Sequence, residues 1–250
     1  MSYLGLSAGF HDAAVSVVDR NGDILFAGHS ERYTRVKNDP EICPEILGDA
    51  ANYDIDHIAF YERPWMHNYQ QWRSGQKSYG PWTARGAVEK HLGIWYNSHS
   101  KTPVSNYPHH LSHAAAGFQT SPFDWAAVVV IDAIGEMDTV SIYRAWYDRE
   151  GRAQYQRVWR QGYPHSIGLF YSAVTSKVGL RPMEDEYVTM GMAAYGDIHW
   201  KKELRRRVID DQGSIVFKHN CHIGLPEGIF DNANKESLAA SAQSLTEEMV

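Results

Sequence analysis

The run Ala126-Ala127-Val128-Val129-Val130-Ile131-Asp132 decides the fold class, because a continuous apolar stretch of this length is typical of a buried strand in an α/β sheet. After this run, residues 139–147 alternate between apolar and polar side chains, as in a strand. Residues 148–151 (Asp-Arg-Glu-Gly) form a turn, and residues 153–160 form a strand that runs back. We therefore predict three antiparallel strands, with 126–132 as the central, buried strand.

The same pattern occurs earlier in the chain. Residues 3–9 and 13–19 are predicted strands. Residues 20–23 (Arg-Asn-Gly-Asp) form a turn that accepts positive φ, and residues 24–29 form the third strand. In each copy a polar turn follows the first strand, and the two copies are about 125–129 residues apart. The pattern indicates an internal duplication.

Helices are predicted after each three-stranded unit, at 109–120, 166–178, 185–195 and 235–250. A duplicated unit with intervening helices indicates an α/β protein of the actin-like ATPase fold, the superfamily of sugar kinases, heat-shock proteins and actin. The predicted lobes are 1–124 and 125–250, and the second is expected to be incomplete. Because the last predicted helix is followed by no cap or polar tail, we expect a fragment or one half of a split protein.

Composition narrows the function classes. A net charge of −6 and 43% hydrophobic residues are ordinary for a soluble protein. The two cysteines, Cys43 and Cys221, lie far apart in sequence, and two free thiols in a reducing cytoplasm are a simpler interpretation than one disulfide. There is no basic excess to indicate a nucleic-acid groove, although one local patch could contact phosphate. No signal peptide is recognisable, and no window approaches the roughly 18 apolar residues of a membrane span.

Two histidines, His109 and His113, are four residues apart on a predicted helix, so their imidazoles share one face and could bind one metal ion. Asp132, at the end of its strand, is the candidate third ligand, because ligands bind at the carboxyl edge of such sheets. A His-His-Asp set suits iron(II), manganese or zinc. The alternative is a pair of ordinary surface histidines. His110 points about 100° away on the helix and is interpreted as structural or supporting.

A second candidate group lies in the turn after the first strand. His11 could act in acid–base catalysis or polarise a carbonyl, with Asp12 orienting it or capping the next segment. The alternative is a turn histidine bonded to backbone. Lys37 lies in the charged run 31–39, which is either an anion site or a solvated connection.

Two further stretches could contact phosphate. Gly135 and Glu136 lie in the turn of the second copy, where backbone N–H groups could cradle an anion. Ser166 and Gly168 open the predicted helix 166–178, and helix N-termini bind phosphate. Ser166 could equally be an N-cap residue.

Taken together, these stretches resemble the carbamoyltransferases of the NodU and TobZ type, which tailor nodulation factors and aminoglycosides. The resemblance follows family order through residues 4–14 (LGLSAGFHDAA), 31–39 (ERYTRVKND), 109–115 (HHLSHAA), 132–136 (DAIGE), 166–175 (SIGLFYSAVT) and 186–196 (EYVTMGMAAYG).

The resemblance implies a two-step reaction. Carbamoyl phosphate and ATP would give carbamoyl-adenylate on a separate YrdC-like C-terminal part. The metal-bearing, actin-like part would then transfer the carbamoyl group to a hydroxyl or amine of a small acceptor, such as a sugar, an aminoglycoside or a nucleoside. The resemblance further implies that His109, His113 and Asp132 hold the metal, with iron(II) favoured. It places His11 beside the carbamoyl group, and Gly135, Glu136, Ser166 and Gly168 along the nucleotide cleft.

The chain departs from the family pattern in one motif. The family has Asp-Gly-x-Gly-Glu where this chain has Ala133 in second position, and a methyl group there could crowd the phosphate or change the turn. A later acid that completes the family's metal site is not among the 250 residues, nor is the YrdC-like part. Two alternatives remain open: a threonylcarbamoyl-type tRNA-modifying relative, and a non-catalytic remnant or subunit of a split enzyme.

Overall fold

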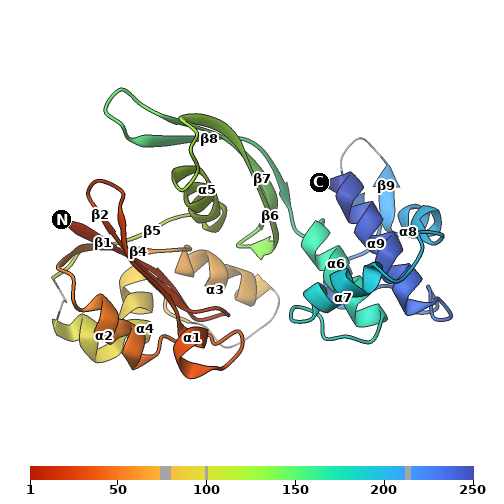
Figure 1. Ribbon diagram of the computed structural model, residues 1–250, viewed down its shortest axis with the longest axis horizontal. Coiled ribbons are helices and arrows are strands. Elements are labelled where there is room, and N and C mark those ends of the chain that lie inside the picture. Colours follow the sequence, from red (N-terminus) through yellow and green to blue (C-terminus); the bar gives the residue numbers. More distant parts are fainter. Residues whose placement is uncertain (74–79, 99–100, 212–214) are drawn as a thin grey trace. The chain divides into compact units, whose positions relative to one another are not determined.

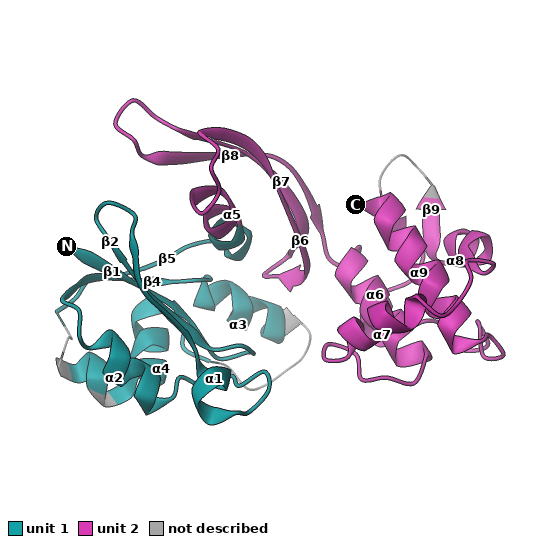
Figure 2. Cartoon of the chain, in the orientation of Figure 1, with its two compact units in different colours: residues 1–113 teal, residues 114–250 magenta. Residues whose placement is uncertain are grey.

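The computed structural model describes residues 1–73, 80–98, 101–211 and 215–250. The chain forms two compact units, Met1–His113 and Ala114–Val250, which Figure 2 colours separately. The division falls inside helix α5 (His109–Gln119), ahead of the lobe boundary predicted at 124/125. Within the described ranges, no helix is long and apolar enough to cross a bilayer.

The first unit contains a five-stranded sheet of order β3-β2-β1-β4-β5 (Figure 1). Strand β1 pairs antiparallel with β2 and parallel with β4, β2 pairs antiparallel with β3, and β4 pairs parallel with β5. The three predicted strands are confirmed, while the two parallel strands were not predicted. The strands are β1 (Ser2–Ser7), β2 (Ala14–Asp19), β3 (Ile24–His29), β4 (Ile55–Phe60) and β5 (Val104–Asn106).

Helices α2 and α4 lie on the same side of this sheet and bury its apolar face (Figure 1). Alternate residues of β1 and β2, such as Leu4 and Val15, are fully or almost fully buried, because a strand presents every second side chain to one face. They share a core with Ile46 and Leu92. The helices of this unit are α1 (Ser30–Thr34), α2 (Pro44–Ala50), α3 (Pro64–Arg73) and α4 (Ala84–Ser98), and α5 begins in it.

The second unit opens with a three-stranded antiparallel sheet of order β6-β7-β8, in which the predicted second copy is confirmed. The end of α5 packs on this sheet through Phe118, whose ring stacks on Tyr147 at 5.1 Å and meets Tyr155 edge-on at 5.9 Å. The strands are β6 (Trp125–Gly135), β7 (Asp138–Tyr147) and β8 (Ala153–Gly162).

The expectation that 126–132 is a central, buried strand is wrong for the described residues. Strand β6 is at the edge of its sheet, and its side chains alternate between exposed and covered. Val129 is 56% exposed, whereas its neighbour Val130 is 6% exposed. An apolar run marks a strand but does not show whether both of its faces are covered.

The two copies share the chemistry of their second turn, which agrees with the predicted duplication. Asp19 and Asp148 each accept hydrogen bonds, at 2.8–2.9 Å, from the backbone N–H groups two and four residues later. Each turn then contains a glycine with positive φ, Gly22 at 93° and Gly151 at 74°.

The remainder of the second unit is mainly helical. Helix α9 turns Leu238, Ala242 and Leu245 toward a core that includes Phe170 and Val174, so its apolar spacing matches one helix face. The helices predicted at 166–178, 185–195 and 235–250 are confirmed with slightly different ends. The elements are α6 (Ile167–Lys177), α7 (Glu186–Ala193), α8 (Lys201–Val208), β9 (Ile209–Asp211), β10 (Ile215–Phe217), the 3-10 helix η1 (Cys221–Ile223) and α9 (Lys235–Met249).

Candidate functional site

The histidine pair lies at the start of α5. His109 Nε2 and His113 Nε2 are 3.0 Å apart, and their ring centroids are 4.8 Å apart, so the predicted convergence of the two imidazoles on one helix face is confirmed. Two nitrogens at this separation can each lie about 2.1 Å from a shared metal ion. The donor set and its spacing therefore fit a divalent transition metal.

Residues that follow strand β4 hold the pair in place. The Ser112 hydroxyl donates to the carbonyl oxygen of Tyr61 at 2.7 Å, which fixes the first turn of α5 to the end of the strand. The Tyr61 ring meets the His109 ring edge-on at 5.3 Å. Glu62 Oε2 lies 3.7 Å from His109 Nδ1, and both side chains are 16% exposed. A carboxylate behind a ligating imidazole orients the ring and increases its basicity.

His110, between the two, is 2% exposed. This burial agrees with its interpretation as a structural residue on another face of α5. Sequence reasoning missed Glu62, because it comes from a segment whose strand was not predicted and nothing in its local pattern links it to the histidines.

Asp132 belongs to the second unit and lies inside β6, which continues to Gly135; the expectation that it ends the strand is wrong. The pairing of β6 with β7 is irregular between Ile131 and Gly135. Such irregularities re-aim side chains and are common next to functional sites. The Asp132 carboxylate accepts the N–H of Ala133 at 2.6 Å.

The start of α6 packs against this irregular segment. The Ser166 hydroxyl accepts the N–H of Leu169 at 3.1 Å and donates to the carbonyl oxygen of Asp132 at 3.2 Å. Ser166 is thus an N-cap residue, fully buried. A Cβ at Gly168 would lie 2.9 Å from Ala133 Cα, so this position has a packing requirement of its own. The nucleotide contacts expected of Ser166 and Gly168 stay predictions.

Glu136 follows in the tight turn between β6 and β7, whose ladder closes at the Gly135–Asp138 pair. Its backbone is left-handed, with φ 58°, and its side chain is largely buried. A non-glycine residue held in this conformation is uncommon and is often associated with function. The phosphate contacts expected of Gly135 and Glu136 stay predictions.

The first turn of the first unit carries a second group. His11 Nδ1 lies 2.8 Å from Asp12 Oδ2, so the predicted orienting role of Asp12 has the required geometry. Asp12 is also left-handed, with φ 54°. His29, at the end of β3, places Nε2 3.4 Å from the other oxygen of Asp12. Sequence reasoning did not identify His29, because its contact with Asp12 depends on the β2–β3 ladder.

Beneath this turn lies His91, from helix α4. A Cβ at Gly9 would be 2.9 Å from His91 Nε2, and Gly9 has φ 99°. Both the limited space and the backbone conformation therefore require glycine at this position. The His91 side chain is only 4% exposed, and its Nδ1 is 3.4 Å from Glu41 Oε2. Burial lowers the pKa of His91, although Glu41 opposes this. Burial therefore favours the uncharged form of this ring.

Lys37 lies, exposed, in the segment between α1 and α2. The segment contains two left-handed residues, Arg35 at φ 61° and Asn38 at φ 57°, and the N–H of Asn38 donates to Glu31 Oε2 at 3.1 Å. The carboxylate of Asp39 accepts the Thr34 hydroxyl at 2.7 Å, and this bond lowers the Asp39 pKa. The charged run is therefore ordered by its own hydrogen bonds.

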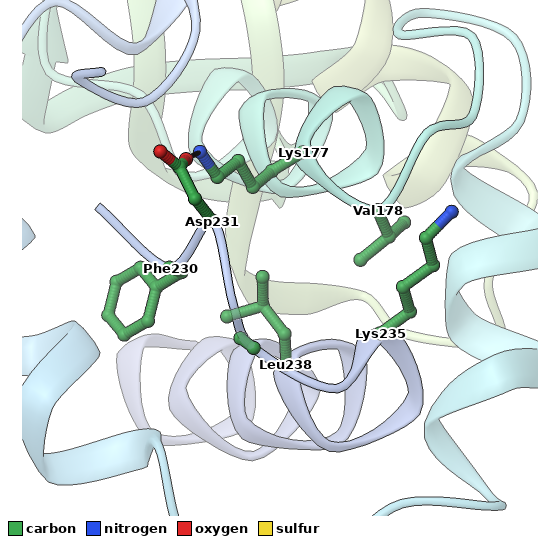
Figure 3. Close-up of a pocket in the computed structure, with 7 residues that line it drawn as sticks. Lys177, Val178, Phe230, Asp231, Lys235 and Leu238 are labelled. Atoms are coloured by element: carbon green, nitrogen blue, oxygen red, sulfur yellow. Dashed lines mark hydrogen bonds and ion pairs between the residues drawn. The ribbon is translucent and has the colours of Figure 1, made fainter. Parts of the chain in front are cut away.

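A small pocket lies elsewhere, between α6 and the N-terminal end of α9 (Figure 3). Its volume is about 190 Å³, and none of the predicted site residues lines it. Lys177 and Asp231 form an ion pair at its rim, so the charge of this lysine is already compensated. The pocket is unrelated to the predicted chemistry.

Comparison with known proteins identifies the class. The sequence model of the carbamoyltransferase N-terminus matches residues 51–222. The chain belongs to this family. The mixed α/β class expected for such a protein is what the two units show.

Among curated relatives, the uncharacterized protein sll1178 of Synechocystis is 30% identical over 87% of this chain and 38% of its own length. The nodulation protein NolNO of Sinorhizobium fredii is 28% identical over 75% of this chain and 28% of its own length. The uncharacterized protein MJ1051 of Methanocaldococcus jannaschii is 31% identical over 77% of this chain and 33% of its own length. This chain thus spans about a third of the length of these relatives.

Similar solved structures include the activator of the 2-hydroxyisocaproyl-CoA dehydratase from Clostridium difficile with bound ADPNP, at 11% identity and a TM-score of 0.43, covering 99% of this chain and 73% of that one. A ROK family protein from Streptococcus pneumoniae TIGR4 in complex with sucrose has 13% identity and a TM-score of 0.39, covering 99% of both chains.

Proposed function

We propose that this chain carries out the transfer step of a metal-dependent carbamoyltransferase. It would move a carbamoyl group from carbamoyl-adenylate, made from carbamoyl phosphate and ATP, to an acceptor hydroxyl or amine. The observation that carries the proposal is the 3.0 Å approach of His109 and His113 in a chain of the carbamoyltransferase family. A small-molecule acceptor such as a sugar, aminoglycoside or nucleoside is proposed.

His109, His113 and Asp132 are the proposed metal ligands, with iron(II) favoured over manganese or zinc. Two neutral imidazoles and one carboxylate with open positions suit these ions. When bound, the ion would supply positive charge to the adenylate phosphate, which is the leaving group. The chain's own contribution is to hold the two imidazoles together through Ser112, Tyr61 and Glu62.

His11 is the proposed acid–base residue, and Asp12 its partner. Because Asp12 accepts a hydrogen bond from Nδ1, the neutral ring would carry its proton there and keep a lone pair on Nε2. The acceptor oxygen or nitrogen attacks the carbamoyl carbon, and the bond from that carbon to the phosphate oxygen breaks. The acceptor's proton passes to Nε2 of His11, and AMP leaves.

The remaining predicted residues would serve the nucleotide. The exposed ammonium of Lys37 could pair with carbamoyl or phosphate oxygens. Gly135 and Glu136 would present the β6–β7 turn to the nucleotide. Ser166 and Gly168 would act by shaping the start of α6, because the Ser166 hydroxyl already bonds within the protein. A YrdC-like part, fused or separate, is the proposed source of carbamoyl-adenylate.

The test combines the chain with the C-terminal part that the resemblance implies, including both the later acid and the YrdC-like part, and adds ATP, carbamoyl phosphate and iron(II) under anaerobic conditions. Pyrophosphate reports formation of the adenylate, and mass spectrometry of a panel of sugars, aminoglycosides and nucleosides reports the carbamoylated product. His113→Ala should abolish product while leaving pyrophosphate release unchanged. His57→Ala is the matched control, because His57 contacts Ser105 on β5 rather than the pair. Product that persists in His113→Ala, or that forms without metal, would contradict the proposal.

A further inference from the structure

The carboxylate of Asp12 is shared between two histidines. One oxygen lies 2.8 Å from His11 Nδ1, and the other lies 3.4 Å from His29 Nε2. The side chains of His11, Asp12 and His29 are 54%, 45% and 30% exposed, so exposure falls from the reacting end inward. This order is what a supported acid–base pair requires, with the outermost group reaching the substrate and the innermost fixed by the fold.

The backbone explains why a supporting residue is needed. Asp12 is held in a left-handed conformation on a turn, which is costly for a residue with a side chain. His29, by contrast, is part of the β2–β3 ladder, where it pairs with Ala14. The turn is tied down on both sides, because Ala13 N donates to Asp39 O and Ser30 N donates to Ala13 O, each at 2.8 Å. These bonds fix the backbone of the turn, whereas His29, held in the ladder, lies beside the carboxylate of the Asp12 side chain.

We propose that His29 is a positioning residue for carbamoyl transfer: its Nε2 holds one oxygen of Asp12, so that the other oxygen fixes His11 with its proton on Nδ1. The inference rests on the proposed function of His11. The groups that face His29 are Asp12 from the turn and Asp39 from the segment after α1, and Asp39 is itself held by Thr34 and by the N–H of Glu41.

The arrangement has a chemical consequence. Without a fixed carboxylate, a neutral imidazole exchanges between its two tautomers, and a proton on Nε2 removes the lone pair that would accept the acceptor's proton. A support of this kind changes the fraction of His11 in the reactive tautomer without touching the substrate. Its loss should therefore lower kcat more than it changes KM.

The test uses the 250-residue chain with ¹⁵N-labelled histidine, and reads the tautomer of His11 from its ring nitrogen shifts at pH 8. Wild type should show the proton on Nδ1. His29→Ala should shift His11 toward the Nε2-protonated form, and His57→Ala should not. An unchanged His11 pattern in folded His29→Ala protein would overturn the inference.

Two isosteric variants cover the case in which His29→Ala fails to fold. The side-chain nitrogen of glutamine can reach the place of imidazole Nε2, whereas that of asparagine stops near the place of Nδ1. We expect His29→Gln to keep the wild-type His11 pattern and His29→Asn to lose it. The same behaviour in both variants would overturn the inference.

Kinetics then separate this inference from the proposed function. In the assay with the complete C-terminal part, His29→Ala should lower kcat roughly tenfold, which is the smallest effect typical of orienting partners, and His29→Gln should restore kcat. If His29→Ala shifts the His11 tautomer as expected but wild type makes no carbamoylated product, the positioning role is supported and the proposed function is wrong. If wild type makes product but substitution of His29 changes neither the His11 tautomer nor kcat, only the positioning role is wrong.

Discussion

Gly168, in the first turn of α6, lies directly against the backbone of Ala133 in β6. A Cβ at Gly168 would be 2.9 Å from Ala133 Cα and 3.0 Å from Ala133 N, closer than side-chain carbons approach backbone. Ser166 bonds the carbonyl oxygen of Asp132 beside it. The start of α6 is therefore packed tightly against the segment that carries Asp132. A larger residue at Gly168 should displace Asp132, the proposed third metal ligand.

Gly168→Ala should destabilise the chain by about 1–3 kcal/mol, because both neighbours are backbone atoms and cannot give way as a flexible side chain would. Urea denaturation of the two proteins measures the difference. Gly191→Ala is the matched control: Gly191 lies in α7 with nothing within 4 Å of its would-be Cβ, and alanine there should stabilise by about 0.5–1 kcal/mol. Equal effects at the two glycines would contradict the close approach of α6 to β6.

His91 should make stability depend on pH in the acid range. Burial lowers its pKa in the folded state below the ordinary value of 6.5, so the unfolded chain takes up the proton first as pH falls. The contribution of the buried neutral ring is present above pH 6.5 and is lost progressively as pH drops below it. The urea midpoint should therefore fall between pH 7.5 and pH 5.5, and His91→Asn should flatten that part of the profile. A variant with the wild-type profile would show that His91 does not titrate on unfolding.

Glu62 should tune the proposed metal site. Its carboxylate lies 3.7 Å from His109 Nδ1, and such partners typically change metal affinity 10- to 100-fold. We expect Glu62→Gln to weaken iron(II) binding about tenfold by anaerobic calorimetry, and His113→Ala to abolish it. Saturating metal should also stabilise the wild type, by about 2.7 kcal/mol at one hundred times its Kd. Glu45 is an exposed residue in the first turn of α2, and Glu45→Gln should change neither quantity.

The sequence was informative wherever the signal is local. The spacing of His109 and His113 alone brings their rings together, and the Asp19 and Asp148 turns follow from a few neighbouring residues. The groups that support the site could not be predicted in the same way. Glu62 and His29 reach their partners through strand pairing and helix packing, and such contacts leave no periodicity in a single sequence.

The same distinction explains the error at β6. An apolar run reports that its residues prefer to be buried, but coverage of both faces depends on neighbours that the run does not encode. The structure places Ala133 among the partly buried apolar residues packed against the core of the second unit, and its expected effect on phosphate binding stays a prediction.

The same substitution at the adjacent residues Val129 and Val130 tests whether β6 is covered on only one face. Val130→Thr should cost about 1–3 kcal/mol, because Val130 is 6% exposed and the new hydroxyl would be buried. Val129→Thr should stay within about 0.5 kcal/mol, because Val129 is 56% exposed. Urea denaturation of both variants measures the difference, and their shared backbone and chemistry make each the control for the other. A strand covered on both faces would lose similar stability at the two positions, and that result would show that the second face of β6 is occupied in solution.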